Sequence, residues 1–179
     1  MNRSAKLVLA LVVPAAMTAT VLTAPVAHAD DRTCRGTIGQ RQLDENVIVP
    51  RGATCTLAGT RVDGNVFVRD NATLIAKGVR VGGNVQAEDH QRVVVRHRQV
   101  DGKARRSRVE GSIQLEHGGG GKLLRTVVGA DIQLFSNDGR FVVRRNVVGG
   151  NLQCKSNDPA PVGGNNTVEG NKEDQCQNL

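Results

Sequence analysis

Basic side chains gather between Gln91 and Arg108. Seven positions in this segment are Lys or Arg and one, Asp101, is acidic, so its net charge is 7 − 1 = +6. The basic residues are Arg92, Arg96, Arg98, Lys103, Arg105, Arg106 and Arg108. Guanidinium groups bind phosphate and carboxylate groups through paired hydrogen bonds. The segment therefore predicts a binding site for an anionic partner, with a solvated, flexible loop as the alternative.

Several anionic partners fit this charge: an anionic cell-wall polymer such as wall teichoic acid, an acidic glycan, a membrane surface or a nucleic acid. Nucleic acid is the least favoured, because no aromatic side chain lies near the basic residues to stack on bases. The chain has only three aromatic residues, Phe67, Phe135 and Phe141.

Carboxylates form a second candidate site. Asp70 and Asp89 each lie five residues after an asparagine in a repeated motif, and Glu88 adjoins Asp89. Paired carboxylates can hydrolyse glycosides or bind calcium. Turns, however, require Asp, Asn and Ser in any case, and we expect the chain to have no aromatic platform for a sugar ring. We therefore predict no catalytic residue and no enzyme, with a small carbohydrate-active enzyme as the alternative.

Metal and cofactor sites are not indicated. His90, His97 and His117 occupy different positions of the repeat described below. The glycine run at 118–121 lacks the Lys-Ser/Thr ending of a phosphate-binding loop. We predict no metal site and no cofactor.

A repeat must position all of these side chains. Its copies align on one polar residue, as in "VDGNV" (62–66) and "VGGNV" (81–85). The aligned residues are Asn46, Asn65, Asn84, Ser112, Asp131, Asn151 and Asn171, at steps of 19, 19, 28, 19, 20 and 20. A regular period of this length predicts a solenoid. The one long step contains "VDGKARRSR" (100–108), which we interpret as a projecting loop or partial coil within an insertion at about 91–108.

Apolar residues alternate with polar ones around each aligned position, which is typical of strands. Three apolar columns recur, three residues before the aligned position, just after it (Val47 and Val49 in the first copy), and eleven residues after it (Leu57, Val95, Leu123, Val142 and Val162). We predict an all-β, single-stranded parallel β-helix of about seven coils. The regular steps are not multiples of six, as the hexapeptide pattern of left-handed helices requires, so right-handed coiling is favoured.

The aligned polar column is predicted to be a structural ladder, with side-chain amides bonding to each other between coils. Its members are Asn46, Asn65, Asn84, Asp131, Asn151 and Asn171. The glycines before the asparagines are predicted to provide corners with positive φ.

The ends of the chain indicate secretion. A positive start, an apolar run and Ala27-His28-Ala29 predict a signal peptide at 1–29, followed by a β-helix domain at 30–179 without a membrane span. Cys34 and Cys55 are 21 residues apart, and Cys154 and Cys176 are 22 apart. Since each separation is about one coil, we predict that these pairs form disulfides closing the two ends.

The segments "CTLAGTRVDGNVFVRDNATLIAKGVRVGGNV" and "VGGNLQCKSNDPAPVGGNNTVEGNKEDQC" resemble small secreted β-helix proteins of actinobacteria that carry G-N-V repeats and have no assigned function. The chain is similar, more loosely, to bactofilins, which are polymer-forming β-helices. This resemblance implies the fold and offers a self-assembling surface protein as a further alternative. The leading interpretation is a secreted, non-enzymatic structural or binding protein of the cell envelope.

Overall fold

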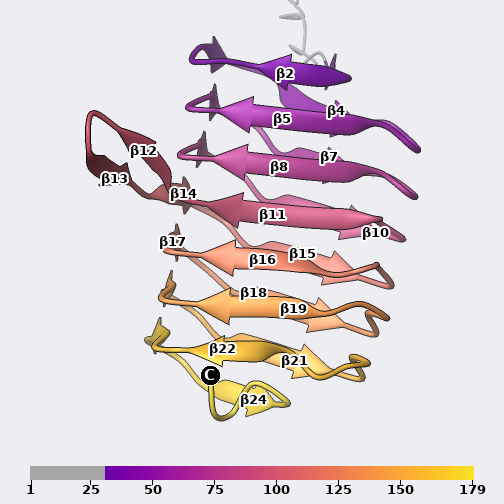
Figure 1. The fold of residues 1–179 in the computed structure, drawn as a ribbon, viewed down its shortest axis with the longest axis vertical. Helices are drawn as coiled ribbons and strands as arrows, with labels where there is room; N and C mark the ends of the chain where they lie inside the picture. The colour runs from indigo at the N-terminus through magenta and orange to yellow at the C-terminus, as the bar shows by residue number, and fades with distance from the viewer. Residues whose placement is uncertain (1–30) are drawn as a thin grey trace, which may run out of the picture.

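Every regular element of the computed structural model, which describes residues 31–179, is a β-strand. In Figure 1 the chain descends coil by coil, with the near strands running to the left and the strands behind them running to the right. This sense of rotation is right-handed, as predicted. The predicted signal peptide, 1–29, lies outside the described residues. Among residues 31–179 there is no helix long and apolar enough to cross a membrane.

The coils stack into three parallel sheets. Sheet A contains β1 (Asp31–Thr33), β4 (Asn46–Val49), β7 (Val66–Val68), β10 (Val85–Glu88), β15 (Ile113–Glu116), β18 (Ile132–Phe135), β21 (Leu152–Lys155) and β24 (Lys172–Asp174). Sheet B contains β2 (Gly36–Ile38), β5 (Thr54–Ala58), β8 (Thr73–Lys77), β11 (Arg92–Arg96), β16 (Gly121–Leu124), β19 (Phe141–Arg144) and β22 (Val162–Gly164). Sheet C contains the short strands β3 (Gln42–Leu43), β6 (Arg61–Val62), β9 (Arg80–Val81), β14 (Ser107–Val109), β17 (Thr126–Val128), β20 (Val147–Val148) and β23 (Thr167–Val168).

The solenoid has about one turn more than the seven predicted. Sheet A has eight strands because β1 pairs with β4, which places Asp31 beside Asn46. These two residues are only 15 apart, so a search at the regular period of the repeat does not find this first turn. The Asn46 side chain donates a hydrogen bond of 3.0 Å to the Asp31 carboxylate.

The core consists of the predicted apolar columns. Val47, Val66, Ile113 and Ile132 are fully buried and lie in register along sheet A. Burying such aliphatic side chains stabilises the fold by about 1.5–3 kcal/mol each.

The predicted apolar column that begins at Leu57 is wrong for its last two members. Val142 and Val162 point outward, and Val162 is 38% exposed. Leu123 pairs with Val143, which is buried in their place. The turn before β19 is one residue longer than the turn before β16, and in a strand a shift of one residue moves a side chain to the opposite face.

The aligned asparagines bond differently from the prediction. The side-chain oxygen of Asn46 accepts from the main-chain N–H of Asn65, and that of Asn65 from the N–H of Asn84, both at 2.8 Å. The same contact continues through Ser112, Asp131, Asn151 and Asn171. Each coil therefore holds the main chain of the next one. Of the bonds between neighbours in this column, one joins two side-chain amides, from Asn65 to Asn46 at 3.3 Å.

The glycines before these asparagines are needed for space, and the prediction of positive φ was wrong for them. Gly83, Gly111 and Gly170 are outside the positive-φ region. A Cβ atom on any of them would overlap Oδ1 of the asparagine in the preceding coil. Asparagine and glycine thus act together between coils. The asparagine of one coil bonds to the main chain of the next coil, and the glycine of that next coil leaves room for the asparagine side chain.

Buried asparagines form two further ladders at the corners of the coil. Asn137 and Asn157 lie between sheets A and B, and Asn146 and Asn166 lie between sheets B and C. Their side chains bond to the next coil and to main-chain carbonyls, as from Asn137 to the Leu115 oxygen at 3.0 Å. These asparagines were not predicted, because they lie outside the one polar column on which the repeats align.

Both predicted disulfides are present. Cys34–Cys55 and Cys154–Cys176 have Cα–Cα distances of 5.5 and 5.2 Å and join neighbouring coils at the two ends. All four residues are buried. In the chain-entropy model each bond stabilises the fold by about 3 kcal/mol. Two structural disulfides indicate an oxidising, extracellular environment.

Candidate functional site

The insertion is an antiparallel hairpin that projects from the solenoid (Figure 1). Its strands, β12 (Arg98–Val100) and β13 (Lys103–Arg105), are joined by Asp101 and Gly102, whose φ angles are 49° and 71°. Positive φ at both positions defines the two-residue turn favoured in hairpins, and Asp-Gly is its usual sequence. The "DG" of "VDGK" therefore encodes the turn of this hairpin.

The predicted basic residues fall into three groups, on the hairpin, on sheet B and on sheet C. Arg98, Lys103, Arg105 and Arg106 belong to it, and all but Arg98 are exposed. Arg92 and Arg96 lie at opposite ends of β11 in sheet B.

Arg108 lies on sheet C, in register with Arg80, and its guanidinium is 3.7 Å from the Glu110 carboxylate. The 91–108 segment is therefore not one continuous loop.

Arg98 anchors the hairpin on the solenoid. Its guanidinium donates to the carbonyl oxygen of Ala58 at 3.2 Å, two coils away. Gly59 and Gly78 make room for the side chain, since a Cβ on either would collide with Arg98. Ser107 fixes the other end, donating to the Arg96 carbonyl at 2.7 Å and accepting from the Val79 N–H at 3.2 Å. The hairpin is thus an ordered, supported element.

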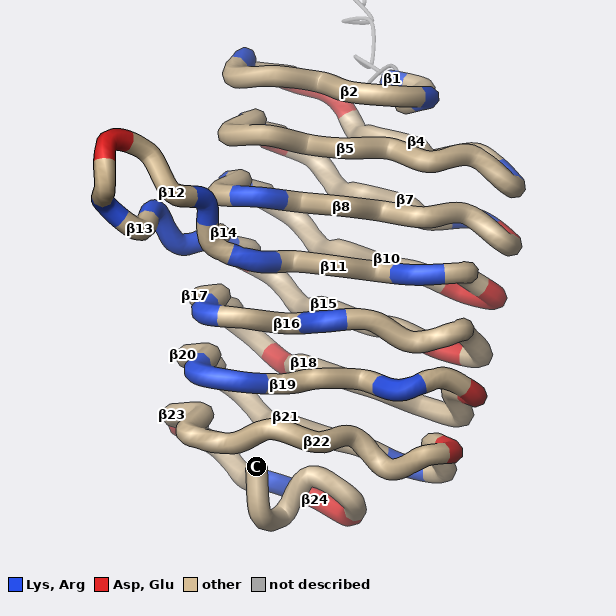
Figure 2. Tube along the Cα trace, viewed as in Figure 1, with Lys and Arg blue, Asp and Glu red and all other residues tan. Residues whose placement is uncertain are grey.

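Stacking adds further basic residues to those of the hairpin (Figure 2). We define the basic face as residues 73–78, 92–106, 121–125 and 141–145, which are four sheet B strands, their following corners and the hairpin. It holds 11 Lys or Arg residues and one acid, a net charge of +10. The other described residues hold 11 Lys or Arg and 15 acids, a net charge of −4. Positive charge is therefore segregated on one side of the molecule.

An open cavity of about 340 Å³ lies on the basic face. It is lined by His97, Lys122, Leu124, Arg125, Val142, Arg144 and Arg145. The loss of hydration on burial, with the charges of Arg125 and Arg96, holds the pKa of His97 below its ordinary value. This site was not predicted from the sequence, because the residues that line it lie in three different coils and are up to 48 positions apart.

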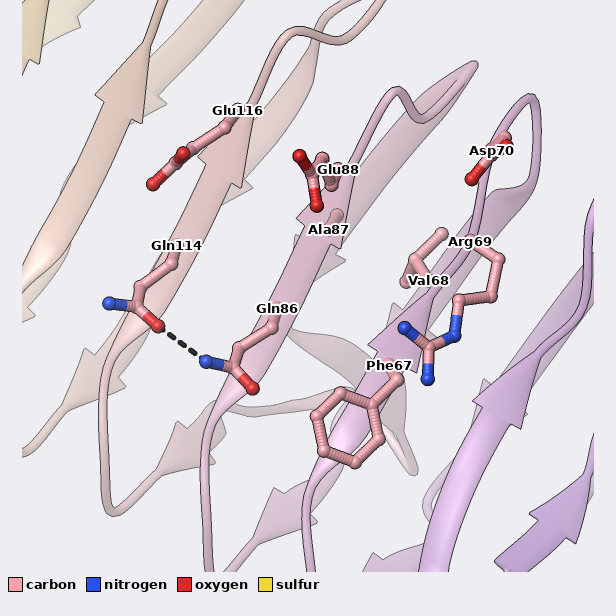
Figure 3. Close-up of a pocket in the computed structure, with 9 residues that line it drawn as sticks. All are labelled: Phe67, Val68, Arg69, Asp70, Gln86, Ala87, Glu88, Gln114 and Glu116. Carbon is pink, nitrogen blue, oxygen red and sulfur yellow. Dashed lines mark hydrogen bonds between the residues drawn. The ribbon is translucent and has the colours of Figure 1, made fainter.

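A second open cavity, of about 280 Å³, lies on the outer face of sheet A (Figure 3). Asp70, Glu88 and Glu116 lie along one side of it, and Phe67, Gln86 and Gln114 along the other. The guanidinium of Arg69 lies 5.4 Å from the centre of the Phe67 ring. The cavity thus combines three carboxylates with an aromatic ring, so the prediction that no aromatic side chain accompanies the carboxylates was wrong.

The predicted carboxylate pair lies at the turns between sheets A and B. Asp70 and Asp89 both line a third cavity, of about 530 Å³, together with His117 and Asp138. His90 also borders it but is buried, with neither ring nitrogen hydrogen-bonded. No group of three or more His, Cys, Asp or Glu side chains suited to a metal ion occurs within 31–179.

Comparison with known proteins finds no matching family model, no similar curated protein and no similar solved structure. The resemblance to secreted actinobacterial β-helix proteins and to bactofilins therefore stays a prediction from the sequence.

Proposed function

We propose that this protein is a secreted, non-enzymatic β-solenoid of the cell envelope that binds an anionic polymer through its basic face. The observation that carries the proposal is the segregation of charge, +10 on the basic face against −4 on the remaining described residues. Such a field attracts polyanions over a range of about 10 Å at moderate salt.

The rigidity of the fold supports binding rather than catalysis. Main-chain ladders fix the backbone positions of the basic residues in successive coils at spacings of about 4.8 Å. A flexible polyanion then loses conformational freedom while the protein loses little. Preorganisation of this kind favours affinity, because less entropy is lost in forming each contact.

Removal of the hairpin charges is expected to weaken binding without affecting the fold. We predict that Lys103→Gln, Arg105→Gln and Arg106→Gln together lower the affinity for a teichoic acid polymer about tenfold at low salt. Each contact to an anionic group that is lost should also make the dependence on salt less steep, by analogy with counterion release from nucleic acids. Isothermal titration calorimetry over a salt series measures both effects.

The matched control removes the same charge from sheet A. Arg32→Gln, Arg69→Gln and Lys155→Gln change three exposed residues on the strands of that sheet or just beyond them. Affinity should fall far less than in the hairpin variant. If the two triple variants lose equal affinity, the basic face has no special role and the proposal is wrong.

A second candidate function is carbohydrate cleavage at the sheet A cavity. The observation that favours it is the presence of Asp70, Glu88 and Glu116 beside the Phe67 ring. Release of reducing ends from neutral and acidic polysaccharides by the wild-type protein, abolished by Asp70→Asn with Glu88→Gln, would support it. Absence of release by the wild-type protein would contradict it and favour the binding function.

A further inference from the structure

The cavity on the basic face is built by three successive coils. Main-chain hydrogen bonds from His97 to the Leu124 carbonyl and from Arg125 to the Arg144 carbonyl, 3.3 and 3.0 Å long, hold the coils in register. His97, Arg125 and Arg145 therefore follow one another along the corner between sheets B and C. Arg144 is in register with Leu124 on the neighbouring strand, and Lys122 with Val142. The lining of the cavity combines four cationic side chains, Lys122, Arg125, Arg144 and Arg145, with two apolar ones, Leu124 and Val142.

The backbone at this corner adopts a left-handed conformation that is unfavourable for most side chains. Arg125 and Arg145 have φ angles of 51° and 57°, in the left-handed region. The other non-glycine residues with positive φ within 31–179 are Asn, Asp, Ser or His, and Asn, Asp and His are the types found most often there. At the equivalent corner two earlier coils use glycine, Gly59 and Gly78. Arginine is thus placed where glycine would relieve strain, and strained residues cluster at functional sites.

No carboxylate balances these charges. Three ion pairs occur among residues 31–179, and all of them lie at the sheet C side, between Arg61, Arg80 or Arg108 and Asp63 or Glu110. No acidic residue lines the cavity. Nδ1 of His97 is buried and has no hydrogen-bond partner. The cationic side chains that line the cavity therefore have no acidic partner there.

We propose that this cavity binds a phosphodiester group, through Lys122, Arg125, Arg144 and Arg145, with His97 at its edge. The inference rests on the proposed function and specifies the polymer as phosphate-bearing. Donors reach the cavity from several directions, since they come from both strand and corner positions of successive coils. The four oxygens of a phosphodiester, two of which share the charge, point in tetrahedral directions that match such donors, whereas the two oxygens of a carboxylate lie in one plane. Leu124 and Val142 would contact the carbon atoms that link successive phosphates.

The test uses glycine, the residue of the earlier coils, at the two strained positions. Arg125→Gly with Arg145→Gly should leave thermal stability unchanged or raise it, because the left-handed backbone suits glycine. We expect the affinity for poly(glycerol phosphate) to fall at least tenfold more than the affinity for polygalacturonate, a carboxylate polymer. The control, Arg32→Gln with Lys155→Gln, removes two charges from sheet A and should affect both polymers little.

The outcomes separate the two proposals. If the glycine variant loses equal affinity for the two polymers, the cavity is not selective for phosphate. This inference then fails while the proposed function stands. If the wild-type protein binds neither polymer, both fail.

A small probe, glycerophosphoglycerol, gives a second readout that does not involve the polymer. The probe has no titrating group near neutral pH, and the groups lining the cavity around His97 are Lys122, Arg125, Arg144 and Arg145, with Arg96 adjacent. A bound anion should raise the pKa of His97, measured by NMR. An unchanged His97 titration at saturating probe would overturn the inference.

Discussion

Replacing Asn137 by leucine is expected to lower the free energy of unfolding by about 4 kcal/mol. Asn137 is fully buried. Its amide donates to the Leu115 carbonyl at 3.0 Å and to Asn157 Oδ1 at 2.8 Å, and its oxygen accepts from the Gly118 N–H at 2.9 Å. Leucine keeps the volume but removes the partner of the Leu115 carbonyl and of the Gly118 N–H, at about 1–3 kcal/mol for each buried unsatisfied group, while Asn157 Oδ1 still accepts from the main-chain N–H of residue 137.

Urea unfolding of the oxidised protein, followed by circular dichroism, measures this loss. Asn171→Ala is the control, because Asn171 lies in the outer asparagine column and is exposed. Its expected cost is below about 0.5 kcal/mol. Equal costs for the two substitutions would show that the buried corner ladder does not stabilise the fold.

Acid is expected to destabilise the protein through His90, and His90→Asn should remove that effect. His90 is 2% exposed and packs against Phe141, with 6.1 Å between ring centres. The loss of hydration on burial lowers its pKa from 6.5 to about 4. Asparagine is the residue found at the matching corner positions 137 and 157, so the variant should fold.

The direction in which stability changes with pH follows from the protons that the folded and unfolded states bind. Above pH 6.5 His90 is neutral in both states and contributes no pH dependence. Between pH 6.5 and 4 the unfolded chain binds a proton that the folded protein does not, so stability falls as the pH falls. The full loss is about 3 kcal/mol, from about 1.4 kcal/mol per pKa unit. Unfolding free energies at pH 7.5, 5.5 and 4 measure it.

The exposed His117 provides the control for this experiment. His117→Asn should fold, since asparagine tolerates the left-handed backbone of that position, where φ is 50°. Because this variant retains His90, its stability should depend on pH as that of the wild-type protein does. If His90→Asn loses as much stability in acid as the wild-type protein, His90 is not the group responsible.

The repeat predicted the architecture well because periodicity reports directly on stacking. Val47 and Val66 share a column since they are separated by one step of the repeat, and an interval of about one coil predicted the partner of each cysteine. Prediction failed where the period changes by a single residue. One extra residue before β19 turned Val142 and Val162 outward.

The site was predicted only in part, because the sequence analysis counted charges along the chain. That count found Lys103, Arg105 and Arg106 of the hairpin. It could not find Arg125 and Arg145, whose proximity depends on the stacking of coils. Their signal is visible only after alignment of the coils, when arginine occupies corners that hold Gly59 and Gly78 earlier in the chain.

The two disulfides have a consequence for how the protein comes apart. In a stack where each coil contacts only its neighbours, unravelling begins most easily at an end, where a coil has one neighbour instead of two. Cys34–Cys55 and Cys154–Cys176 tie these terminal coils to the next ones. While its disulfide is intact, a terminal coil cannot separate from its neighbour, so unravelling from either end must open at least two coils together. Proteolysis that depends on unravelling from an end of residues 31–179 should therefore be slower for the oxidised protein than for the reduced one.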